Sequence, residues 1–118
     1  MQISVSGKQL AVGAALRSHI DGHLRDAVAK YFDQALEAHV VVSRAAHNVR
    51  VDITTQAARN IQVQAHAEAP DPYIAYELAA DRIAKRLRRT KRLRVKRRRT
   101  GASDGAGAGR RRAATDEE

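Results

Sequence analysis

The stretch that decides the fold is residues 61–89, IQVQAHAEAPDPYIAYELAADRIAKRLRR. Residues 61–68 place apolar side chains at every second position and polar side chains between them, which is typical of a strand buried on one face. Asp71 and Pro72 follow this strand. An Asp side chain can accept hydrogen bonds from the free amide groups at a helix start, and Pro is tolerated at the first helical position because its N–H would be unpaired there. A helix is therefore expected directly after the strand.

This expected helix has two chemically different sides. One side is an apolar stripe at helical spacing, formed by Tyr73, Tyr76, Ala80, Ile83 and Leu87. The other side, roughly opposite, carries cations at the same spacing: Arg82, Lys85, Arg86 and Arg89. The pattern predicts that the apolar side packs on a sheet while the cations form a ladder in solvent. Ile74 and Leu78 point away from the stripe; we interpret them as exposed apolar residues rather than as a protein-contact patch.

The upstream sequence supplies the rest of the sheet and a second helix. Residues 2–6, 39–43 and 49–55 alternate like strands, whereas Gly13–Phe32 has the periodicity of an amphipathic helix. Short polar connections at 44–48 and 56–60 suit hairpins, so the last three strands are expected to be an antiparallel meander. The first strand joins by a helical crossover and should be parallel to its neighbour. The prediction is an α+β fold, a two-layer β-α-β-β-β-α sandwich with two helices on one face of a four-stranded sheet.

The basic charge of the chain is concentrated at one end. Residues 1–81 have a net charge of −2 and residues 82–118 a net charge of +11, and twelve of the 22 Lys and Arg residues lie within 82–99. A dense cationic stripe of this kind is typical of a protein that binds a polyphosphate, because each neutralised phosphate releases condensed counterions. The apolar side of the same helix consists of small residues and tyrosines needed for the core and offers no Trp, Phe or Leu that is free to enter lipid. Phosphate is therefore favoured over a membrane surface as the partner of the cations. We expect a domain over residues 1–96 and a flexible basic Gly/Ala/Arg tail or linker over 97–118.

Other classes of function find little support in the composition. The chain has no cysteine and no apolar segment of membrane-spanning length, so we expect a soluble cytoplasmic protein without thiolate chemistry. His19 and His23 are four residues apart, but no third ligand is placed nearby, and no metal or other cofactor is expected. No phosphate-binding glycine loop or catalytic constellation is apparent, so we predict a protein that is not an enzyme and has no small-molecule substrate. The few aromatic residues also argue against base-by-base reading of single strands.

The order of several short motifs resembles a known family, the ribosome hibernation-promoting factors, also described as ribosome-associated inhibitors or sigma-54 modulation proteins. The similarity covers residues 1–96 and is strongest to members from alphaproteobacteria. The motifs that carry it are Ile3-Ser4-Val5-Ser6-Gly7-Lys8, Ala15-Leu16-Arg17, Lys30-Tyr31-Phe32-Asp33, His39-Val40-Val41-Val42, Ala67-Glu68-Ala69 with Asp71-x-Tyr73-x-Ala75, and Asp81-Arg82-Ile83-x-Lys85-Arg86-Leu87-Arg88-Arg89.

The resemblance implies a domain similar to double-stranded-RNA-binding folds that lodges in the decoding channel of the small ribosomal subunit. There it would block mRNA and tRNA and silence translation under stress or in stationary phase. The residues implied to face rRNA are Arg82, Lys85, Arg86, Arg88, Arg89 and Arg92, with Lys8 and Arg17 as weaker candidates. His23 stands where many relatives have Lys, so no phosphate contact is expected from it. Longer members carry a C-terminal module that joins two ribosomes, and that activity is not expected without the module. The alternative is a general duplex-RNA or DNA binder or a chromosome-associated protein using the same helix.

Overall fold

The computed structural model describes the backbone of residues 1–103 and the side chains of residues 1–94. Its elements, in chain order, are β1 (Gln2–Lys8), α1 (Ala14–Ala29), β2 (Glu37–Ala45), β3 (Asn48–Ala58), β4 (Ile61–Ala69) and α2 (Pro72–Ser103). The chain divides into two compact units, Met1–Leu87 and the remainder from Arg88. The first unit holds the whole sheet, α1 and the beginning of α2. The described part of the second unit, through Ser103, is helical.

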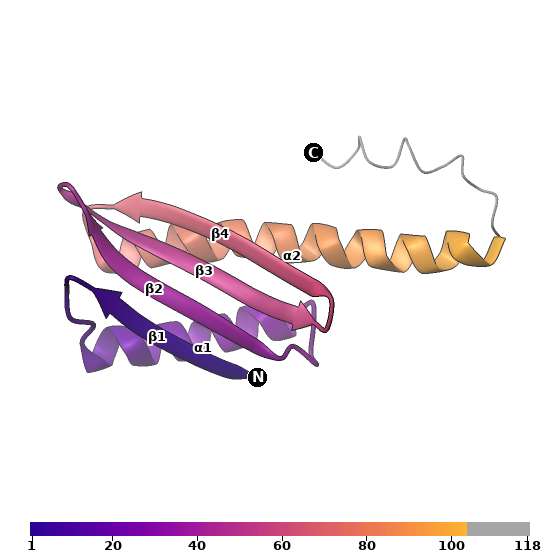
Figure 1. Cartoon of the computed structure of the whole chain (residues 1–118), viewed down its shortest axis with the longest axis horizontal. Coiled ribbons are helices and arrows are strands. Elements are labelled where there is room, and N and C mark those ends of the chain that lie inside the picture. Colours follow the sequence, from indigo (N-terminus) through magenta and orange to yellow (C-terminus); the bar gives the residue numbers. More distant parts are fainter. Residues whose placement is uncertain (104–118) are drawn as a thin grey trace. The chain divides into compact units, whose positions relative to one another are not determined.

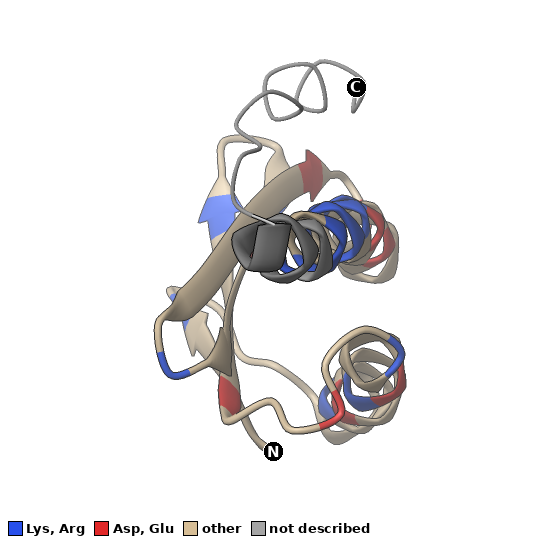
Figure 2. Ribbon diagram, turned by 90° about the vertical axis from the view of Figure 1, so that its right-hand side faces the viewer, with Lys and Arg blue, Asp and Glu red and all other residues tan. Residues whose placement is uncertain are grey.

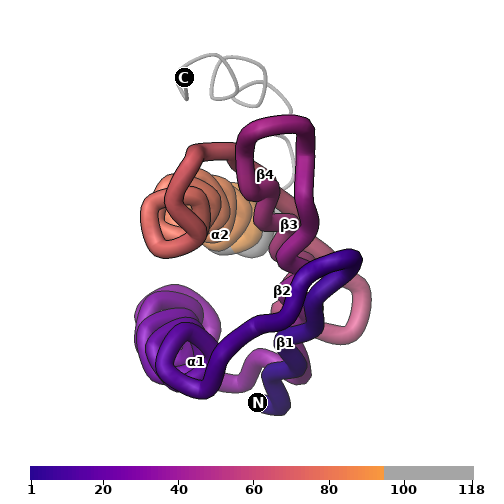
Figure 3. Tube along the Cα trace, turned by 90° about the vertical axis from the view of Figure 1, so that its left-hand side faces the viewer, coloured from indigo at the N-terminus to yellow at the C-terminus, as the bar shows by residue number. Residues whose placement is uncertain are grey.

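The predicted topology is confirmed. The four strands are ordered β1-β2-β3-β4, with β1 parallel to β2 and the other two pairings antiparallel (Figure 1). Helix α1 and the first turns of α2 lie on the same face of the sheet (Figure 3). β4 is therefore an edge strand, and its outer side has no neighbouring strand within the described residues.

The core lies between the sheet and the two helices. One row across the sheet joins Val5, Val40, Ile53 and Ala65, and all four side chains are buried. From the helices, the fully buried large side chains are Ile20, Leu24, Val28, Tyr76, Ile83 and Leu87. The opposite face of the sheet is polar, as the alternation predicted, because every second residue of each strand points away from the core.

The strands are longer than the sequence predicted, because pairing with neighbours extends them beyond the alternating cores. β1 continues through Gly7 to Lys8, and Gly7 approaches the carbonyl oxygen of Leu10 so closely that a side chain would collide with it. β2 and β3 pair continuously from Glu37 opposite Gln56 to Ala45 opposite Asn48. Residues 46–47 alone form the turn between them.

Two expectations about α2 need correction or qualification. Tyr73 is 41% exposed, so it is not part of the buried stripe. The stripe also includes Ala75 and Ala79, which moves its centre and leaves Tyr73 at the border beside α1, with its ring next to His19. The helix also continues through Ser103, beyond residue 96, where we expected the tail to begin; residues 104–118 of that tail lie outside the described part.

Thr55 provides a test of the core. Its side chain is completely buried on β3, and its hydroxyl has no hydrogen-bond partner within the described structure. Replacing it with Val removes a desolvated polar group and keeps the shape, so Thr55→Val should raise the free energy of unfolding by about 1 kcal/mol. Urea and thermal unfolding measure the change. Thr54→Val, on the half-exposed side of the same strand, is the control and should change stability by no more than about 0.5 kcal/mol. A loss of stability in Thr55→Val would show that the hydroxyl has a partner.

Candidate nucleic-acid interface

The cations of α2 are placed by the buried stripe of the same helix. Ile83 and Leu87 are fully buried against the sheet, which fixes the rotation of the helix about its axis. Arg82, Lys85 and Arg86 are consequently exposed. Figure 2 shows Lys and Arg gathered along α2, with acidic residues near the start of this helix, whereas blue and red alternate on α1.

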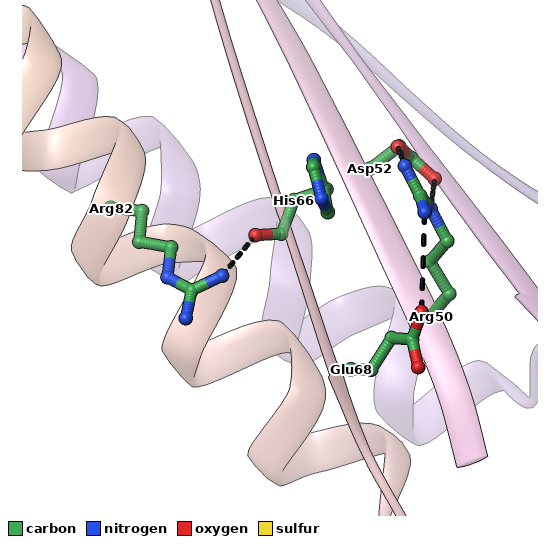
Figure 4. Close-up of polar contacts among 5 residues, drawn as sticks. All are labelled: Arg50, Asp52, His66, Glu68 and Arg82. Carbon is green, nitrogen blue, oxygen red and sulfur yellow. Dashed lines mark hydrogen bonds and ion pairs between the residues drawn. The ribbon is translucent and has the colours of Figure 1, made fainter.

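The sequence indicated that Arg82 and Arg86 point away from the sheet into solvent. In the structure, both side chains turn toward strand β4. Nη1 of Arg82 donates a hydrogen bond of 2.7 Å to the backbone carbonyl of His66 (Figure 4), and Nη1 of Arg86 donates to the carbonyl of Gln64. Both carbonyls belong to β4. Two of the predicted RNA-facing residues therefore lie along the outer edge of the sheet, at the border between the buried stripe and the solvent.

Lys85 lies further from the sheet and has a different partner. Its Nζ is 3.4 Å from Asp81, one helical turn earlier, and both side chains are about two-thirds exposed. An exposed pair at this spacing contributes only a few tenths of a kcal/mol, but it places a negative charge beside the cations. This ion pair was not predicted from the sequence, although the spacing of four residues between Asp81 and Lys85 could have indicated it.

Arg88, Arg89 and Arg92 belong to the second compact unit. They lie on the continuing helix, together with Lys91 and Arg94. Five cations within seven residues give this segment a strong positive potential of its own.

The two weaker candidates lie elsewhere in the first unit. Arg17, near the start of α1, donates a hydrogen bond to the carbonyl of Val5 on β1. Lys8 is exposed at the end of β1. These residues share the β1–α1 end of the fold and come from different elements than the α2 cations.

Two other arginines of the first unit, Arg25 and Arg50, are paired with carboxylates. Arg25 pairs with Asp21 at 2.9 Å. On the open face of the sheet Arg50 lies 3.0 Å from Asp52 and 4.0 Å from Glu68 (Figure 4). The hydrogen bond from Arg50 to Asp52 and the charge of Asp52 raise the pKa of the Arg50 guanidinium. Arg25 and Arg50 therefore lie in local ion pairs, whereas Arg82 and Arg86 of α2 are bonded to neutral backbone carbonyls.

A cluster of rings joins α1 to the start of α2. Nδ1 of His23 is 2.8 Å from the Tyr76 hydroxyl, and Nε2 of His19 is 2.9 Å from Glu77. The two imidazole rings stack with centroids 5.7 Å apart. His23 thus has a hydrogen-bonding partner inside the protein, on the other helix.

The chemistry available to the described residues is that of a binding surface. Among them, no group of three or more His, Cys, Asp or Glu side chains is placed to hold a metal ion. Within residues 1–103 neither helix is long and apolar enough to cross a membrane. What the geometry does offer is a row of guanidinium and ammonium groups on one helix, which suits phosphate oxygens.

Comparison with known proteins identifies the family. The pattern of the family described as Sigma 54 modulation protein / S30EA ribosomal protein matches residues 3–94. The chain belongs to this family, which confirms the resemblance inferred from its motifs. It is 35% identical over 92 residues to a ribosome hibernation promotion factor of Rhizobium meliloti, and 33% identical over 91 residues to one of Bradyrhizobium diazoefficiens. These matches cover 78% and 77% of the chain but 48% and 45% of the relatives, so the chain spans about half their length.

Solved structures agree on the fold. The N-terminal domain of Thermus thermophilus Protein Y is similar with a TM-score of 0.67 and 26% identity, over 76% of this chain and 99% of that one. A ribosomal subunit interface protein from Coxiella burnetii is similar with a TM-score of 0.63 and 20% identity, over 77% and 98% respectively. The latter similarity shows the fold alone.

The burial of Tyr76 should make the free energy of unfolding depend on pH in alkaline solution. Burial, with a smaller contribution from Glu77, raises the pKa of Tyr76 above its ordinary value of 10.0. The folded state therefore retains this proton after the unfolded state has lost it, and the stabilisation is lost as pH rises above about 10. Urea unfolding between pH 8 and 11 should show wild-type stability falling more steeply than that of Tyr76→Phe. Tyr73→Phe, at an exposed tyrosine, should follow the wild type. Parallel curves for wild type and Tyr76→Phe would contradict the assignment.

Proposed function

We propose that this protein is a ribosome hibernation factor that binds small-subunit rRNA in the decoding channel. There it blocks mRNA and tRNA binding and silences translation under stress or in stationary phase. The observation that carries the proposal is the exposed row of cations on α2, in a chain whose relatives are named for ribosome hibernation. The role takes place in the cytoplasm and requires no catalytic group.

The RNA contact is assigned to residues 1–96 and the basic tail or linker to residues 97–118, the first part of which, through Ser103, continues helix α2. Arg82, Lys85, Arg86, Arg88, Arg89 and Arg92 are the principal contacts in this proposal. Lys8 and Arg17 are secondary contacts. Joining of two ribosomes is not part of the role proposed for these residues.

Binding to phosphate predicts a specific dependence on salt. Replacing Arg82, Lys85, Arg86 and Arg89 by Ala removes four cations, each worth about 0.7 to 0.9 in the slope of log affinity against log salt. The slope for binding to purified small subunits should become shallower by about three units. Affinity should fall by more than tenfold at low salt, and inhibition of translation in vitro should be lost. Sedimentation with small subunits at several salt concentrations measures the slope.

Arg44→Ala/Arg59→Ala is a suitable control because both arginines are exposed, Arg44 near the end of β2 and Arg59 in the turn between β3 and β4. This variant should bind and inhibit like the wild type. Full translation in the presence of excess wild-type protein, or no co-sedimentation, would contradict the proposal. Equal affinity for random RNA or DNA duplexes and for the subunit would instead favour a general duplex binder.

Removing the negative charge of Asp81 should strengthen binding to the small subunit, in contrast to removing the cations. Asp81 pairs with Lys85 and repels an approaching phosphate, so Asp81→Asn should increase affinity for small subunits by about two- to fivefold at low salt. The gain should shrink as salt rises, because both groups are exposed. Asp33→Asn, at an exposed carboxylate between α1 and β2, serves as the control for net charge alone. An equal gain in both variants would show that Asp81 has no local effect.

A further inference from the structure

The two arginines at the edge of β4 are held by backbone atoms of their own protein. Arg82 and Arg86 are four residues apart on α2, and the carbonyls that they reach, on His66 and Gln64, are two residues apart on β4. Four helical residues rise about 6.0 Å and two strand residues about 6.6 Å. The two spacings match, so successive turns of the helix meet successive outward-facing carbonyls of the edge strand.

Each guanidinium group keeps donors for a second partner. A guanidinium has five N–H donors in a planar fork, and the contact to β4 is made through Nη1. The remaining donors on Nη2 and Nε are enough for a phosphate. A lysine ammonium in the same place would be a point charge on a flexible stem, without a fixed orientation.

We propose that the outer edge of β4 is a positioning element for RNA binding, which orients Arg82 and Arg86 so that each takes its own phosphate. The inference rests on the function proposed above and concerns the same surface. One side of each guanidinium is fixed on a β4 carbonyl, and the other side is presented to the RNA backbone. Less side-chain freedom is then lost on binding, because the two groups are already ordered in the free protein.

Arg82 and Arg86 differ from Lys85, which is the third cation in the first unit's part of α2. Lys85 contributes charge only, because its partner Asp81 is an exposed side chain on the same helix. At positions 82 and 86, in contrast, the shape of the arginine fork contributes in addition to its charge. The identity of the side chain should therefore matter at these two positions even when the charge is kept.

The test is the double variant Arg82→Lys/Arg86→Lys in the full chain, compared with Arg44→Lys/Arg59→Lys. Both variants keep the net charge, and the control changes exposed arginines outside the proposed interface. Binding to purified small subunits should weaken roughly tenfold in the first variant, while the slope against salt stays that of the wild type. The control should remain within about twofold of the wild type. Equal affinity of all three proteins would overturn the inference.

A second measurement examines the free protein without RNA. In NMR spectra of the arginine side chains, Arg82 and Arg86 should show slowed rotation and distinct Nη signals, unlike Arg44 and Arg59. Averaged signals at all four arginines would overturn the positioning by β4. Ordered signals combined with unchanged affinity of the Lys variant would show that the contacts only protect the strand edge, which also overturns it. If the wild-type protein and every variant failed to bind small subunits, the proposed function itself would be wrong. That result differs from failure of the positioning proposal, in which the wild type still binds.

Discussion

The burial of one side of α2 against the sheet is the constraint on which the other features depend. Ile83 and Leu87 are completely excluded from solvent, and burying a side chain of this size is worth about 1.5 to 3 kcal/mol. That contribution fixes how the helix is rotated on the sheet. Once the rotation is fixed, the cations between the apolar positions have only two places available: the border beside β4, occupied by Arg82 and Arg86, and the solvent side, occupied by Lys85.

Charge is distributed so that this helix differs from the rest of the first unit. Arg25 and Arg50 lie beside carboxylates, and the open face of the sheet carries acidic as well as basic groups. On α2, Arg82 and Arg86 are bonded to neutral carbonyls, which leave their positive charge intact. A phosphate backbone approaching the molecule would therefore be attracted to these arginines, whereas Glu77 and Asp81 on the same helix would repel it.

Periodicity and turn chemistry were sufficient to predict the fold. Alternation at 61–68 and the Asp71-Pro72 pair predicted β4 and the start of α2, and the amide of Tyr73 does bond to Asp71 at 2.7 Å. The parallel placement of β1 followed from its helical connection. The exposure of Ile74 and Leu78 was also predicted correctly.

The details of the site required the three-dimensional arrangement. A helical wheel drawn from Tyr73, Tyr76 and Ile83 places the centre of the buried stripe too near Tyr73, because Ala75 and Ala79 also belong to the core. The bonds of Arg82 and Arg86 depend on which carbonyls of β4 face outward, and no sequence pattern reports this. The pairing of His23 with Tyr76 likewise joins two elements that are far apart in the chain.

A structure of the protein bound to the small ribosomal subunit would test the central claim most directly. We predict that α2 lies in the channel where codons are read, with Arg82 and Arg86 each within hydrogen-bonding distance of an rRNA phosphate and still bonded to β4. Binding outside that channel, or with α2 turned away from the RNA, would contradict this claim.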